Sequence, residues 1–79
     1  MIKTTQYFLS TQLRPDRAII KMEWIMYVMH NHEKEFIQDD GRIRRWAKIS
    51  EMGNRYLRIV LLDDAETVHN AFFDRRFTP

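Results

Sequence analysis

Alternating polar and apolar residues in three neighbouring segments constrain the fold of this chain more than any other feature. The segments cover residues 42–50, 55–62 and 67–73, and such alternation is typical of strands that bury one face. Gly53 and Asn54 separate the first two segments, and residues 63–66 separate the last two. Short connections of this kind favour hairpins. The pattern therefore predicts an antiparallel meander.

The remaining elements complete an α+β fold. Residues 35–38 predict another strand, which the Asp40-Gly41 turn joins to residues 42–50, and residues 3–9 predict a first strand. Pro15 and Asp16 suit the first turn of a helix, and dense apolar residues at helical spacing follow from Ala18 to His30. They predict one helix, which begins either at Pro15 or, if residues 17–20 are extended, near Lys21. We expect a single domain over residues 1–79. Its one main N-terminal helix packs on a curved antiparallel sheet, in the chain order β-α-β-β-β-β.

Composition narrows the class of protein. The 79 residues include no Cys, which excludes disulfides and thiolate metal sites and fits a reducing, cytoplasmic environment. The longest apolar run, residues 24–29, is far shorter than a membrane span requires, and residues 1–10 do not have the pattern of a signal peptide. His30 and His32 lack the accompanying ligands of a metal site. We expect no cofactor, no metal and no membrane partner.

Positive charge concentrates in the middle of the meander. Residues 42–58 contain six basic side chains and one acid. Alternation places a set of basic and aromatic residues on the sheet face opposite the helix: Arg44, Trp46, Lys48, Tyr56, Arg58 and His69. It also directs Val68, Asn70 and Phe72 toward the helix and Ala71 away from it. Cations between aromatic rings favour nucleic-acid binding, whereas the alternative is a solvated face whose charges block edge pairing. The candidate nucleic-acid-binding residues are Arg42, Arg44, Trp46, Lys48, Arg55, Arg58 and Arg75.

His69 is the candidate general base. Neighbouring positive charge favours its neutral form, which could remove a proton from a ribose 2′-hydroxyl. Arg44, Lys48 and Arg58 would then stabilise the charged phosphate. The alternative is a partly buried histidine whose ring is only a hydrogen-bonding partner.

Five stretches carry a resemblance to a known family: PDR at 15–17, EWI at 23–25, DGRIRRW at 40–46, YLRIV at 56–60 and TVHNAFFDR at 67–75. The chain resembles small bacterial proteins similar to the RelE/ParE toxin superfamily, including its BrnT-like members. The resemblance implies a helix against a curved sheet and an mRNA endonuclease that a cognate antitoxin holds inactive. It also implies catalytic Arg, Lys, Tyr and His residues on the free face, which here are Arg44, Lys48, Tyr56, Arg58 and His69. The chain departs from many relatives in having one N-terminal helix and no C-terminal helix.

Two functions remain open at this point. The first is a toxin that binds RNA, cleaves mRNA without a metal and is neutralised by a cognate antitoxin protein. The second is a non-catalytic module on the same fold that binds RNA or a protein, with a second copy of the chain as one such partner. A domain of this size builds only a small core, so a partner chain is expected in either case.

Overall fold

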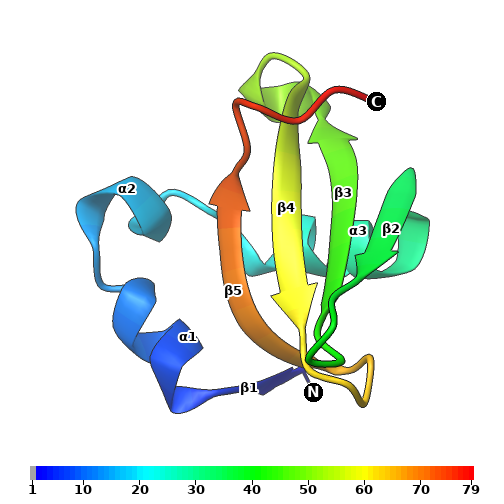
Figure 1. Cartoon of the computed structure of the whole chain (residues 1–79). Coiled ribbons are helices and arrows are strands. Elements are labelled where there is room, and N and C mark those ends of the chain that lie inside the picture. Colours follow the sequence, from blue (N-terminus) through cyan, green and yellow to red (C-terminus); the bar gives the residue numbers. More distant parts are fainter. Residues whose placement is uncertain (1) are drawn as a thin grey trace.

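A computed structural model describes residues 2–79 and shows an α+β fold with a five-stranded mixed sheet (Figure 1). The strands are β1 (Lys3–Thr4), β2 (Lys34–Ile37), β3 (Ile43–Ile49), β4 (Arg55–Leu61) and β5 (Thr67–Phe73), in the spatial order β1-β5-β4-β3-β2. The helices are α1 (Gln6–Thr11), α2 (Pro15–Ala18) and α3 (Met22–Asn31), with a 3₁₀ turn, η1, at Ser50–Met52. The predicted meander of β2 to β5 is confirmed.

Residues with positive φ angles make the tight turns of the meander. Gly41 has a φ of +90° between β2 and β3, and Gly53 and Asn54 have φ values of +69° and +63° between β3 and β4. Glycine adopts this backbone region without strain, and asparagine tolerates it better than most residues. The predicted turns are therefore confirmed at both places.

The predicted strand over residues 3–9 is wrong beyond Thr4. The Thr5 side chain accepts a hydrogen bond from the Phe8 backbone N–H (3.1 Å) and caps α1. Phe8 is then fully buried in the core, so burial outweighs the strand propensity of the Tyr and Phe residues. The two-residue β1 pairs with β5 in parallel, which makes the sheet mixed rather than antiparallel.

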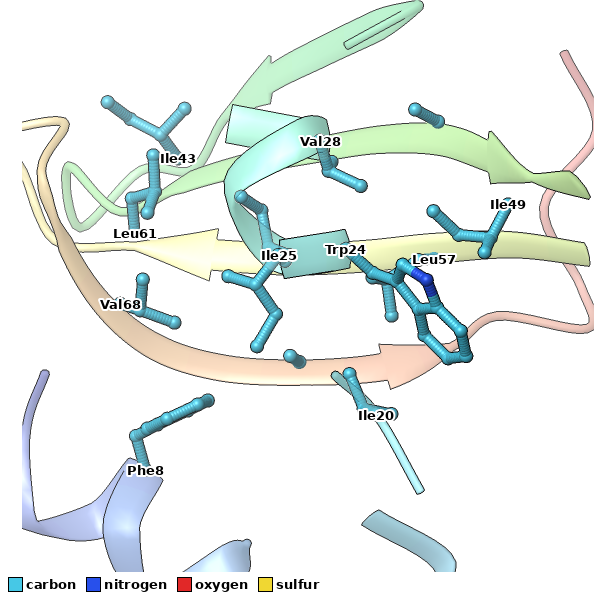
Figure 2. Close-up of a cluster of buried hydrophobic side chains, with 13 residues drawn as sticks. Phe8, Ile20, Trp24, Ile25, Val28, Ile43, Ile49, Leu57, Leu61 and Val68 are labelled. Atoms are coloured by element: carbon cyan, nitrogen blue, oxygen red, sulfur yellow. The ribbon is translucent and has the colours of Figure 1, made fainter. Parts of the chain in front are cut away.

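Helix α3 covers one face of the sheet. Its start at Met22 agrees with the alternative near Lys21, but Arg17 and Ala18 are helical rather than extended, because Pro15 begins the separate short helix α2. Trp24, Ile25 and Val28 point into the core, as Figure 2 shows. Arg45, the one charged residue among the core-facing alternates of β3, donates to the Met29 carbonyl (2.9 Å) near the end of α3. The buried residues of this core are Phe8, Ile20, Trp24, Ile25, Val28, Ile43, Ala47, Ile49, Leu57, Ile59, Leu61, Val68 and Ala71.

A β-bulge in β5 changes which side chains face the helix. Val60 pairs with Asn70 but Leu61 pairs with Val68, so one residue of β5, His69, has no partner. Val68 and Ala71 therefore both lie in the core. The expectation that Asn70 and Phe72 face the helix and Ala71 faces away is wrong, because the extra residue shifts the alternation by one position.

Candidate nucleic-acid interface

The outer face is the side of the sheet opposite α3. Register places one set of alternates there, because residues directly opposite each other in neighbouring strands share a face. These residues are Lys34, Phe36, Arg44, Trp46, Lys48, Tyr56, Arg58, Val60, Asn70 and Phe72. Five of the six residues predicted for this face therefore lie on it. Arg45, Arg55 and the core residues occupy the other alternates.

The C-terminal tail, residues 74–79, crosses the outer face. The Phe77 ring stacks on Trp46 with centroids 4.8 Å apart, and it also contacts Tyr56. Asp74 accepts a hydrogen bond from Trp46 Nε1 (3.1 Å) and lies 3.6 Å from an Arg58 guanidinium nitrogen. The expectation that Trp46 is open for stacking is thus wrong: its relative exposure is 6%. The tail is not a set of exposed ion pairs but a cover over one part of this face.

Beside the tail lies an open concavity of about 450 Å³, which we call the basic groove. Four cations and three aromatic rings line it, together with one carboxylate. The lining residues are Lys34, Phe36, Arg44, Trp46, Arg58, Asp74, Arg76, Phe77 and Thr78. The fold thus brings together Arg44, Trp46 and Arg58 from the predicted set. It adds Arg76 from the tail. It also adds Lys34, Phe36 and Phe77, which the sequence patterns did not indicate because these residues lie on an edge strand and beyond the last strand.

Arg58 and Arg44 make this groove electropositive. Burial and the neighbouring charge of Arg44 lower the pKa of Arg58, although Asp74 acts in the opposite direction. The Arg58 guanidinium packs on the Phe72 ring (4.9 Å), and its Nε has no hydrogen-bond partner within residues 2–79. This Nε is buried, so an anion in the groove would be attracted by the charge of the Arg58 guanidinium, part of which Asp74 already neutralises.

A second concavity, of about 670 Å³, lies on the other side of the tail. Tyr56, Phe72, Arg55 and Arg75 line it, and Arg17 enters from α2. Arg17 donates to the Asn70 side chain (2.7 Å) and the Ala71 carbonyl (3.2 Å), with its guanidinium over Phe72. Sequence patterns gave no signal for Arg17, since 53 residues separate it from Asn70. The bulge that turns Asn70 outward creates this contact.

The other predicted cations lie apart from the groove. Lys48 lines a separate concavity that also contains Glu23, Glu33 and Glu51, and Arg42 is exposed at the β2–β3 turn, 3.7 Å from Asp40. Tyr56 donates a hydrogen bond to Glu33 (3.2 Å). The positive charge of the sequence segment is therefore distributed around the sheet rather than concentrated on one surface.

His69 is at the bulge, away from the arginines of the groove. Its Nδ1 shares a hydrogen bond with Thr5 Oγ1 (2.9 Å), and its ring stacks on Tyr7 at 4.8 Å. Burial and, to a smaller extent, the charge of Arg42 lower the pKa of His69. His69 lines neither concavity. The fold thus does not gather His69, Arg44, Arg58, Lys48 and Tyr56 into one cluster.

Comparison with known proteins gives no match: no family model, curated protein or solved structure is significantly similar to the chain. In the part that the structure describes, no three His, Cys, Asp or Glu side chains gather as a metal site would require. None of the helices in residues 2–79 combines the length and apolar character needed to cross a membrane.

Proposed function

We propose that this protein is a binding module for single-stranded RNA and that the basic groove is its binding site. The observation that carries the proposal is the groove itself, in which Lys34, Arg44, Arg58 and Arg76 surround aromatic rings. Cations neutralise phosphates and release counterions, while rings offer surfaces on which unpaired bases stack. RNA, rather than another polyanion, is the partner that the resemblance to the RelE/ParE toxins favours.

The groove suits a single strand better than a duplex. Phe36 is half exposed in the groove, and the Arg44 guanidinium lies over its ring (5.5 Å). Arg44 is held there by a hydrogen bond from its Nε to the Gln38 side chain (3.0 Å). A base can stack on this ring and guanidinium pair only when it is unpaired. The phosphates on either side of the stacked base would then interact with the cations of Lys34 and Arg58.

Anisotropy of a labelled ten-nucleotide RNA tests the proposal. Asp74 offsets one of the four cations, so about three phosphates are neutralised and the log–log salt slope is expected near −2. Arg44→Ala should weaken binding several-fold and make the slope less steep by about 0.7. Arg14 is the exposed N-cap residue of α2, away from the groove. Arg14→Ala removes the same charge and should leave both the affinity for RNA and the salt slope nearly unchanged. Binding without salt dependence, or equal effects of both variants, would contradict the proposal.

A second candidate, mRNA cleavage by a toxin of a toxin–antitoxin pair, is favoured by one observation. Burial and the charge of Arg42 lower the pKa of His69, and a general base must start as the neutral imidazole. We propose inducible expression in bacteria as the test, with growth arrest and RNA decay as readouts. Arrest that His69→Gln abolishes, while RNA binding persists, would support cleavage. Normal growth with intact RNA would contradict cleavage and favour the binding module, whereas full decay with His69→Gln would contradict the role of His69 as the general base.

In the toxin case, a cognate antitoxin with an acidic segment would cover the basic groove. Co-expression with the product of the adjacent gene should give a stable complex and raise the melting temperature through binding linkage. Reversal of Arg44 to Glu should weaken that complex, because the groove would lose its charge complementarity.

A further inference from the structure

One aromatic ring holds the end of the tail against the sheet. Asp74, where the tail begins, is fixed by its backbone N–H, which donates to the Tyr56 carbonyl (2.9 Å). Beyond Asp74, no hydrogen bond in residues 2–79 joins the tail to another element. Within residues 75–79 only Phe77 is partly buried, and the other four are exposed. Few buried contacts and no shared hydrogen bonds are typical of segments that detach at a low cost in free energy.

The Phe77 ring covers one aromatic residue on β3 and one on β4. Its plane is nearly parallel to that of Trp46, with an interplanar angle of 16° and centroids 4.8 Å apart. It also lies 4.8 Å from the Tyr56 ring, tilted by 55°. Figure 1 shows the tail, in red, passing from the end of β5 across β4 toward β3. A ring stacked on an indole is also the arrangement that an unpaired base adopts on an aromatic side chain.

Charged groups lie beside these rings as they would beside a bound nucleotide. The Lys34 ammonium is 5.9 Å from the Phe77 centroid, and the Arg58 guanidinium is 5.8 Å from the Trp46 centroid. The Asp74 carboxylate lies 3.6 Å from Arg58 and accepts from Trp46 Nε1. The tail thus presents a ring and a carboxylate where RNA would present a base and a phosphate.

We propose that Trp46 and Tyr56 form a second base-stacking site, which the Phe77 ring occupies until an RNA base displaces it. This inference rests on the proposed function, because it assigns a further stacking site, and a competitor for it, to the same RNA-binding face. While the tail is docked, RNA reaches only the open part of the basic groove, where Phe36 offers the first stacking site. Once the tail leaves, bases also reach the rings between the basic groove and the second concavity.

A docked tail lowers the apparent affinity for RNA without any change in the binding residues. The apparent dissociation constant is the intrinsic constant divided by the fraction of molecules in which the site is open. Phe77→Ala removes the ring that holds the tail and leaves the net charge unchanged. This variant should therefore bind the ten-nucleotide RNA about five-fold more tightly or better, which corresponds to one additional stacked base, without a steeper salt slope.

Anisotropy with two labelled probes tests the inference: the ten-nucleotide RNA and an inorganic polyphosphate of similar charge. Polyphosphate has no bases, so the gain from Phe77→Ala should be confined to RNA. Phe77→Tyr keeps a ring on Trp46 and is the matched control, which should bind RNA as the wild-type chain does. An unchanged or weaker RNA affinity of Phe77→Ala would overturn the inference, because Phe77 would then not compete with a base. An equal gain for polyphosphate would overturn it too, because the tail would then exclude phosphates rather than bases.

Tryptophan fluorescence gives a second readout. Trp24 lies in the core, so a base that stacks on Trp46 quenches the one tryptophan of the outer face. RNA should quench Phe77→Ala more than the wild-type chain, and equal quenching would show that no base reaches Trp46.

Failure of the proposed function has a different signature. If neither the wild-type chain nor Phe77→Ala binds the RNA in a salt-dependent manner, the basic groove is not an RNA site and the second stacking site is excluded with it. Wild-type binding with a salt slope of roughly −2, without a gain from Phe77→Ala, would contradict the second stacking site alone.

Discussion

Trp46 lines the basic groove although it is a buried residue. It is as buried as Trp24, with 6% of each residue exposed, and its N–H donates to Asp74. We therefore predict that Trp46→Ala and Trp24→Ala each lower the free energy of unfolding by about 3–5 kcal/mol, the usual cost of truncating a buried tryptophan. Urea unfolding measures both losses. Phe36→Ala, at a half-exposed position in the same groove, should cost far less, and a Trp46→Ala loss no larger than that of Phe36→Ala would contradict the burial argument.

Asp64, in the turn before β5, makes a pH-dependent contribution to the stability of the fold. Hydrogen bonds from the Thr67 side chain, the Thr67 N–H and the Glu66 N–H lower the pKa of Asp64 to about 2. A lowered carboxyl pKa gives stability that is present above the unfolded value, near 4, and lost as pH falls toward 2. We predict that the melting temperature decreases over this interval and that Asp64→Asn makes the decrease smaller. Asp39→Asn, at an exposed position in another turn, is the matched control and should leave the decrease unchanged.

At the scale of elements, local sequence signals predicted the meander, because each of its turns is determined by neighbouring residues such as Gly41 and Gly53. The first helix was not predictable in this way. Residues 5–11 favour a strand by propensity, and only the burial of Phe8 against distant residues makes them helical. The bulge at His69 depends on pairing between β4 and β5. Alternation could not reveal it, so the faces of residues 70–72 were reversed.

The candidate site was likewise predictable only where regular strand pairing places its residues. Arg44, Trp46 and Arg58 were placed on the correct face because β3 and β4 pair without irregularity. Phe77 and Asp74 were missed as parts of the site, since no periodicity extends past Phe73 to indicate where the tail folds. Arg17 reaches Asn70 and Phe72 from α2, and only the three-dimensional structure reveals this contact.

The tail depends on one ring for its position. Phe77 contacts Trp46 and Tyr56, and the Lys34 ammonium lies 5.9 Å from its centroid. We predict that Phe77→Ala releases the tail and exposes Trp46, which should increase iodide quenching of tryptophan fluorescence and shift the emission to the red. The protein should stay folded, because Phe77 lies outside the main core. Phe73→Ala, which removes a ring packed against that core, should instead lower the melting temperature; unchanged quenching with Phe77→Ala would show that the tail is held by other contacts.

At the scale of the whole molecule, the C-terminal tail divides the outer face into two concavities, because Asp74 and Phe77 line both the basic groove and the larger concavity beside Arg17. Release of the tail by Phe77→Ala should therefore join the two concavities into one surface.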